Sequence, residues 1–351
     1  MTADVAVIGA GISGLALARD LHARGRRALV LERARGVGGR CATRRIDGQP
    51  VDHGVAYLHG RSDRFRSEIE ALATDPSISG WPRVRDGTGV PCQPEAFEAH
   101  EFRIAPAEGV SRLAKRLAQA LDVRLHTRVV ALRPEVKAGN APGWELTLDS
   151  GERLRARVVA LTQPAPWALA LLRTLEPLPE DVAGILPLLE LVRTLPCLTV
   201  IARYAGGVTP PPWDASFPAT SKTIHTILHD SSKRAGRARL TLVIQARPRF
   251  SRGHLSDPAE HWTRMLLDEA ASLHGDWAAR PEHVQSHAWH HARVDAPSSL
   301  AGPIMVQVGD GAVLGISGDG LHSAGGVEGA FLSGLALAER IAATPPSVIP
   351  N

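Results

Sequence analysis

Apolar residues in the first thirty positions follow two different patterns. Residues 5–8 and 28–31 are short, continuous apolar runs, which are typical of buried parallel strands. Between them, apolar residues recur at helical spacing over 12–24. A strand, a helix and a second strand within about thirty residues predict a βαβ unit in a parallel sheet.

The same patterns predict further elements along the chain. Helices are expected at 62–73, 111–121, 257–274 and 326–342. Strands are expected at 123–132, 144–148, 154–161, 197–204, 222–229, 239–246, 304–308 and 312–316. Residues 176–220 are rich in proline, which indicates connections and edge elements. We therefore expect a second, mostly antiparallel layer in the middle of the chain that covers a ligand.

Composition narrows the class of protein. The chain has 351 residues, 44% of them hydrophobic and 22% charged, as in soluble globular proteins of one large unit or two joined domains. The net charge of +4 is spread along the chain, so nucleic-acid binding is not expected. No apolar run is long enough for a membrane span, and Asp4 interrupts any signal peptide. Three scattered cysteines (Cys41, Cys92 and Cys197) favour neither disulfides nor zinc, so a cytoplasmic location is expected.

A glycine motif follows the first predicted strand. In Gly9-Ala10-Gly11-Ile12-Ser13-Gly14, the first glycine permits a tight turn and the second lets a pyrophosphate approach the backbone. The third glycine lets helix and strand pack closely, and the helix N-terminus offers N–H groups to phosphates. Glu32, at the end of the second strand, can accept hydrogen bonds from ribose hydroxyls. Together these features predict dinucleotide binding.

A second motif indicates which dinucleotide is bound. Glu32 is followed by Arg33 and then by Gly38-Gly39-Arg40, a loop expected to fold back over the pyrophosphate. The glycines allow close approach and Arg40 supplies a fixed cation. This arrangement resembles the FAD-binding class that includes monoamine oxidases, phytoene desaturases and protoporphyrinogen oxidases, rather than NAD dehydrogenases.

The resemblance becomes more specific further along the chain. The run 40–45, Arg-Cys-Ala-Thr-Arg-Arg, and the step Asp52-His53-Gly54 are similar to the renalase family, above all its bacterial members. The stretches 158–164, 287–292, 318–320 and 325–334 are also similar to that family. This chain has Val-Ala-Tyr-Leu after the Asp-His-Gly step, where the family has Ala-Gln-Tyr-Phe.

Two Gly-Asp-Gly triplets compete for the last FAD loop. Asp310 lies between two equal apolar runs and therefore suits a hairpin turn. Asp319 lies between a strand and a helix, so it is expected to meet the cofactor. The motifs and the resemblance together assign the following residues to FAD: Gly9, Gly11, Ile12, Ser13, Gly14, Glu32, Arg33, Gly38, Gly39, Arg40, His53, Gly54, Val129, Gly318, Asp319, Gly326 and Val327.

Catalytic side chains are harder to assign than cofactor contacts. His53, Tyr57 and His290 are candidates, of which His53 is the strongest because the resemblance places it beside the flavin. His287 and His290 do not share a face of their predicted strand, and no acidic cluster is near, so no metal site is expected. We see no basis for a covalent flavin link.

These observations predict an α/β protein with a Rossmann-type FAD-binding domain and a second, antiparallel-sheet substrate domain. We expect the FAD domain at 1–60, 105–165 and 295–343, the substrate domain at 61–104 and 166–294, and a tail at 344–351.

The renalase resemblance implies an oxidase with non-covalent FAD. Such an enzyme takes hydride from 2- or 6-dihydroNAD(P), a small-molecule substrate, and passes the electrons to O2, giving NAD(P) and hydrogen peroxide. One alternative is an amine oxidase or a desaturase-like FAD enzyme. Only two tyrosines, Tyr57 and Tyr204, are available for the aromatic pair that often flanks an amine. A second alternative is a non-catalytic, flavin-binding redox sensor.

Overall fold

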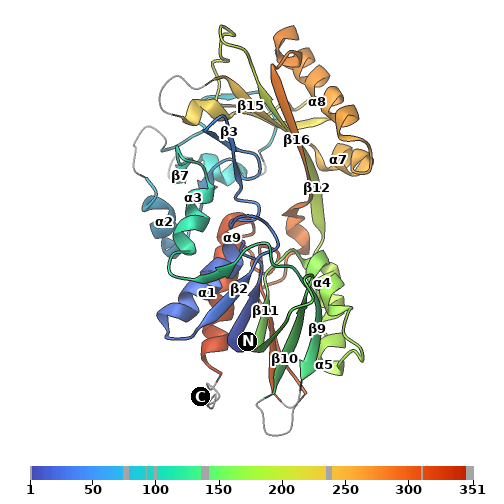
Figure 1. Ribbon diagram of the computed structural model, residues 1–351. Coiled ribbons are helices and arrows are strands. Elements are labelled where there is room, and N and C mark those ends of the chain that lie inside the picture. The colour runs from blue at the N-terminus through green and yellow to red at the C-terminus, as the bar shows by residue number, and fades with distance from the viewer. Residues whose placement is uncertain are drawn as a thin grey trace. The chain divides into compact units, whose positions relative to one another are not determined.

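The structure, a computed structural model, describes residues 2–73, 79–91, 93–98, 101–135, 142–234, 239–309 and 311–344. The chain forms two compact units, each of which is discontinuous in sequence (Figure 1). The first unit comprises Met1–Gly39, Leu113–Thr194 and Arg293–Asn351. The second unit comprises Arg40–Arg112 and Leu195–Ala292.

A mixed sheet forms the centre of the first unit. Its strands run in the order β17-β18-β11-β1-β2-β8, and β10 pairs with both β11 and β9. Strands β18, β11, β1, β2 and β8 are parallel, whereas β17, β10 and β9 pair antiparallel with their neighbours. The bounds are β1 Thr2–Ile8, β2 Ala28–Leu31, β8 Asp122–Arg124, β9 Val129–Glu135, β10 Gly143–Leu148, β11 Arg153–Leu161, β17 Ile304–Val308 and β18 Ala312–Ile316.

Two helices, α1 (Ile12–Ala23) and α9 (Gly326–Ala342), lie side by side in this unit (Figure 1). Their approach is so close that a Cβ on Gly334 would lie 2.3 Å from Ser13 O. A core of alternate sheet residues also packs against α4 (Ala165–Leu172), α5 (Glu180–Ala183) and α6 (Leu186–Leu191). Both sets of contacts bury the apolar runs that predicted the strands.

The second unit contains a six-stranded sheet in the order β16-β12-β15-β14-β13-β6. The bounds are β6 Arg85–Asp86, β12 Thr194–Arg203, β13 Ala215–Ser216, β14 Ile224–His229, β15 Thr241–Ala246 and β16 His283–Val294. Two short strand pairs accompany it: β3 Thr43–Ile46 with β4 Gln49–Asp52, and β5 Leu58–His59 with β7 Arg103–Ile104. The pairs β12–β15, β15–β14 and β14–β13 are antiparallel, but β13–β6 is parallel, so this sheet is mixed.

Alternate residues of this sheet enter two different cores. Val200 and Ile244 belong to a core that includes α8 residues, whereas Ile201 and Val243 pack with Val51 and other residues of a second core. The helices of the second unit are α2 Asp63–Glu70, α7 Pro248–His254 and α8 Ala259–His274. Helix α3 is Ser111–Leu117, and its residues from Leu113 on belong to the first unit. Short 3-10 helices occupy Pro94–Phe97, Asp230–Lys233, Asp276–Ala279 and Ala296–Ser298.

The predicted fold class is confirmed, with corrections to particular elements. The strand expected at 123–132 is two strands, because β8 pairs with β2 whereas β9 pairs with β10, and His126 between them has a φ of +52°. The proline-rich region contains helices, because leucines over 169–189 pack into the core of the first unit. The helix expected at 257–274 begins at Ala259, after Pro258.

The unit boundaries also differ from the expected domain boundaries. Residues 40–60 lie in the second unit, where Ile46 and Val51 pack with the second core. Residues 166–194 lie in the first unit, because α4 and α6 bury their leucines there. None of the helices in the described part of the chain is long and apolar enough to cross a membrane.

Candidate active site

The first glycine motif forms the turn between β1 and α1. Gly9 has a φ of +109°, and its N–H donates to Leu31 O at 2.8 Å. A Cβ on Gly14 would lie 2.1 Å from Gly9 O, so a larger residue cannot be accommodated there without movement of the backbone. A Cβ on Gly11 would meet no heavy atom within 4 Å among the described residues. The turn is thus closed on the helix side and open at Gly11, which suits the approach of a pyrophosphate.

The second glycine loop lies against the first. Gly38 N donates to Ala10 O at 2.8 Å, and Gly38 forms an isolated parallel bridge with Gly11. Both Gly38 and Gly39 have positive φ angles, +117° and +55°. A Cβ on Gly39 would lie 3.5 Å from the Cα of Gly11. The two motifs, more than twenty residues apart in sequence, therefore form one backbone-lined surface.

Glu32 lies beside these loops, at the end of β2. It is 9% exposed, and its two carboxylate oxygens accept from Ala10 N at 2.8 Å and from Ala34 N at 2.7 Å. A carboxylate offers about four lone-pair sites, so Glu32 retains capacity for hydroxyl donors. The next residue, Arg33, stacks its guanidinium on the ring of Trp167, 3.2 Å from the centroid, and burial lowers the pKa of Arg33. No motif in the sequence singles out Trp167.

The end of β18 and the start of α9 form the third part of this region. Ser317 follows β18, and its hydroxyl is 2.8 Å from the hydroxyl of Ser13 in α1. Asp319 follows and is 6% exposed. Helix α9 then begins at Gly326 after Gly325, whose φ is +59° and which, as a glycine, has no side chain to cap this N-terminus.

This arrangement agrees with a ligand loop followed by a helix N-terminus with available N–H groups. Gly318 and Val327 lie in the same segment, in the loop and in the first turn of α9. The competing Asp310 lies outside the described residues. Val129 is the first residue of β9 and belongs to the core of the first unit.

His53 lies in the second unit, in a cluster of rings. Its ring centroid is 5.4 Å from that of Trp289 and 5.2 Å from that of His287, and both residues belong to β16. Trp289 Nε1 donates to His53 O at 3.1 Å, and Gln245 Nε2 donates to Gly54 O at 2.7 Å. Two stretches that carried the renalase resemblance, 52–54 and 287–292, are therefore in contact.

The imidazole of His53 is held in its neutral form. Burial, together with the nearby charges of Arg44 and His287, lowers the pKa of His53 to about 4. Its Nδ1 is buried and has no hydrogen-bond partner among the described residues. An unsatisfied buried nitrogen is unusual in proteins, so a ligand or a water is a natural partner for it.

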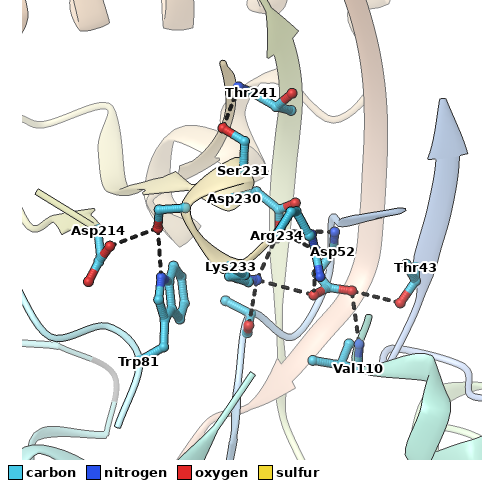
Figure 2. A network of polar contacts seen from close by, with 12 residues as sticks. Thr43, Asp52, Trp81, Val110, Asp214, Asp230, Ser231, Lys233, Arg234 and Thr241 are labelled. Atoms are coloured by element: carbon cyan, nitrogen blue, oxygen red, sulfur yellow. Dashed lines mark hydrogen bonds and ion pairs between the residues drawn. The ribbon is translucent and has the colours of Figure 1, made fainter. Parts of the chain in front are cut away.

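Asp52, the residue before His53, belongs to a buried cluster of four charged side chains (Figure 2). Lys233 Nζ is 3.1 Å from Asp52 Oδ2 and 2.8 Å from Asp230 Oδ1. Arg234 Nη2 is 3.0 Å from Asp52 Oδ2 and 2.9 Å from Asp230 Oδ2. All four side chains are at most 6% exposed, and two cations balance two anions.

This ion cluster (Asp52, Asp230, Lys233 and Arg234) fixes the segment that carries His53. Asp52 also accepts from Thr43 Oγ1 at 2.6 Å, and Lys233 Nζ donates to Ala56 O at 2.6 Å. Burial acts to raise the pKa of Asp52, but Lys233 and Arg234 outweigh it, and the pKa is lowered. The four charges are therefore paired with one another within the cluster.

The other candidates lie elsewhere in the second unit. Arg40 holds the His53 segment through its backbone, since its carbonyl accepts from Val55 N at 3.0 Å. Tyr57 packs 5.9 Å from Phe97, measured between ring centroids. His290 is exposed, and the alternation of β16 places it on the face opposite His287 and Trp289.

Cys41 is buried, and burial raises the pKa of its thiol to about 12. It is therefore not a thiolate at neutral pH, which agrees with non-covalent cofactor binding.

Comparison with known families adds an identity to this geometry. Residues 7–71 match the model of NAD(P)-binding Rossmann-like domains. Residues 74–342, well over half of the chain, match the model of flavin containing amine oxidoreductases. The chain belongs to this flavin-containing amine oxidoreductase family. It is thus an FAD-dependent oxidoreductase, whereas membership of the narrower renalase group is not established by these matches.

Individual relatives agree with the family. (S)-6-hydroxynicotine oxidase of Paenarthrobacter nicotinovorans is 44% identical over 125 residues, which cover 34% of this chain and 29% of the relative. Putrescine oxidase of Kocuria rosea is 35% identical over 92 residues, covering 26% and 18%. The curated relatives are thus matched over less than a third of their own length.

A structure of putrescine oxidase bound to putrescine has the same fold as this chain. It aligns with a TM-score of 0.69 at 17% identity and covers 98% of this chain and 100% of its own. At this level of identity the likeness concerns the fold alone.

Proposed function

We propose that this protein is an FAD-dependent oxidase of amines, with O2 as the electron acceptor. The observation that carries the proposal is the family match over residues 74–342, which includes most of the second unit and the second and third segments of the first. When bound, FAD would supply the redox chemistry, namely acceptance of hydride from the carbon beside the amine nitrogen and transfer of the electrons to O2, which gives hydrogen peroxide. The protein's part is to bind, to orient and to control protonation.

We assign FAD binding in the first unit to backbone groups and to a few polar side chains. The N–H groups at the start of α1, beside Gly11, suit the pyrophosphate, and the open space at Gly11 supports this assignment. Glu32 retains lone pairs for ribose hydroxyls. Asp319 suits a ribityl hydroxyl. The uncapped N-terminus of α9 suits an edge of the flavin that becomes negative on reduction.

We assign His53 a binding role in which it stays neutral. Because its pKa is lowered to about 4, it carries no charge at pH 7 and does not repel a cationic amine. Its unsatisfied Nδ1 can make a hydrogen bond to bound substrate or cofactor. An amine must lose its proton before it can give up hydride from the adjacent carbon. A neutral imidazole is compatible with that requirement, whereas a free carboxylate beside the amine would stabilise its protonated form.

A second candidate function is oxidation of 2- or 6-dihydroNAD(P). The observation that favours it is the contact between His53 and Trp289, which joins two stretches that resemble renalases. Arg44 lies next to this cluster, with Nη2 3.5 Å from His287 Nδ1. A cation there suits an anionic dinucleotide better than a diamine.

Anaerobic reduction of the flavin separates the two candidates. The yellow holoprotein is mixed with putrescine, cyclohexylamine or (S)-6-hydroxynicotine, and in parallel with 2-dihydroNADP or 6-dihydroNAD. We expect at least one amine to bleach the flavin faster than either dihydronicotinamide at equal concentration. Faster bleaching by a dihydronicotinamide overturns the proposal in favour of the second candidate. If no donor bleaches it, the redox-sensor alternative is favoured.

A further inference from the structure

The turn between α7 and α8 brings together three side chains with metal-ligand chemistry. His254 is in the last turn of α7, Asp257 is in the connection, and His261 is in the first turn of α8. One ligand atom from each residue lies within 4.8 Å of the other two, and no other such group of three is found among the described residues. The three come from eight consecutive residues, so their spacing is set locally.

The geometry is already close to that of a chelate. His254 Nδ1 is 2.7 Å from Asp257 Oδ2, and the rings of His254 and His261 are 5.9 Å apart between centroids. A tetrahedral Zn²⁺ with bonds of about 2.0–2.1 Å holds its ligand atoms roughly 3.3 Å apart. Side-chain rotations that move the three ligand atoms by about an ångström are therefore sufficient to bring them into contact with one ion.

The ligand types at this turn, and their exposure to solvent, favour binding of a borderline transition metal ion. Two imidazoles and one carboxylate suit Zn²⁺ and neighbouring divalent ions, whereas Mg²⁺ and Ca²⁺ prefer oxygen ligands. His254 Nδ1 and Asp257 Oδ2 form a hydrogen bond, and a metal ion can take the place of the proton between them. The side chain of His254 is 26% exposed and that of Asp257 38% exposed, so an ion has a path from solvent.

We propose that His254, Asp257 and His261 bind one Zn²⁺ ion per chain, with water in the fourth position, and thereby link α7 to α8. This proposal departs from our expectation from the sequence that the protein has no metal site, which was argued from His287 and His290 on β16. The sequence pattern of the proposed site is His-x2-Asp-x3-His over residues 254–261. This pattern can bring the three side chains together because one helix ends and the next begins between the two histidines.

The test is a titration of tag-free holoprotein with ZnCl2, followed by calorimetry, and with CoCl2, followed by the visible absorption of tetrahedral Co²⁺. We expect saturable binding of one ion per chain. His254→Ala, His261→Gln and Asp257→Asn should each weaken binding at least ~10-fold, since loss of even an outer partner has an effect of that order. The matched controls His283→Ala and Asp268→Asn, which change exposed residues of β16 and α8, should leave binding unchanged.

The outcomes are distinguishable from a folding defect. Circular dichroism and flavin content report whether each variant is folded, and Asp257→Asn preserves the size of the side chain. Zn²⁺ should raise the melting temperature of the wild type and the controls but not of the three site variants. Absence of one-to-one binding, or equal binding by folded wild type and His261→Gln, overturns the proposal.

Discussion

The two units prepare their candidate ligand sites by different physical means. In the first unit, backbone N–H groups, positive-φ glycines and two helix N-termini form the surface, and Glu32 is the main charged side chain. In the second unit, His53 is held by rings of β16 and by an ion cluster whose members Asp52 and Lys233 are 181 residues apart in sequence. The first arrangement depends on the absence of side chains, and the second depends on their pairing.

This difference predicts which substitutions are tolerated in each unit. At the glycine loops of the first unit, an added side chain should disturb folding or FAD binding. In the ion cluster of the second unit, removal of a charge should lower stability.

Gly14→Val should have the largest effect. Even a Cβ at this position would lie 2.1 Å from Gly9 O and 2.6 Å from Thr162 Oγ1, so helix α1 cannot keep its place on the sheet. We expect loss of folded protein, measured by circular dichroism and soluble yield. Gly11→Ala is the matched variant: its Cβ meets nothing, so the apoprotein should fold while FAD retention falls. Full FAD retention by Gly11→Ala would contradict the role given to the open side of the turn.

Lys233→Met should have the next largest effect. It leaves two buried carboxylates, Asp52 and Asp230, with a single cation, so the free energy of unfolding should fall by about 3–5 kcal/mol. Urea denaturation measures the change. Adding Asp230→Asn should restore part of the loss, because the cluster again has equal charges. If the free energy of unfolding of the single variant falls by less than about 1 kcal/mol, the charges of the cluster are solvated or unpaired.

Glu32→Gln should act on the cofactor more than on the fold. Hydrogen bonds to a charged group contribute about 1.5–3 kcal/mol, so FAD affinity should fall roughly ten- to hundredfold. Fluorescence of released flavin during dialysis measures this. The control Glu339→Gln changes an exposed glutamate of α9. Equal FAD retention in both variants would remove Glu32 from the proposed site.

His53 should make stability depend on pH over a defined window. Its folded pKa of about 4 lies below the ordinary value of 6.5, so the unfolded chain binds the proton more readily. The contribution of His53 is therefore fully present above about pH 6.5 and is lost as pH falls toward 4, by about 3 kcal/mol. His53→Gln should flatten this window in urea denaturation curves. The same slope in both proteins would show that His53 titrates normally.

Much of the secondary structure of the first unit could be predicted from the sequence, because the patterns that indicate it are local. The runs 5–8 and 28–31, the two glycine loops and the helix at 326–342 each depend on neighbouring residues, and the structure has them where they were predicted. Trp167 was missed, because a tryptophan at the start of a helix has no distinctive spacing relative to Arg33.

The second unit depends on contacts that no local pattern reveals. Lys233 ends a short 3-10 helix and Arg234 follows it, and both meet Asp52 only after the chain has folded. The hairpin β3–β4 was also missed: its strands are four residues each and mostly only partly buried, so they lack an apolar run. Resemblance to a family pointed to His53 and to the stretch at 287–292, but the packing of the two against each other required the structure.

Product stoichiometry during aerobic turnover of a primary amine tests the central claim most directly. For each amine group oxidised, an amine oxidase consumes one O2 and one water, and releases one carbonyl product (an aldehyde from putrescine, a ketone from cyclohexylamine), one ammonia and one hydrogen peroxide. We expect equal amounts of ammonia and peroxide from the holoprotein with putrescine or cyclohexylamine, and none after removal of FAD. Peroxide formed only from dihydronicotinamides, with no ammonia from any amine, would contradict the account.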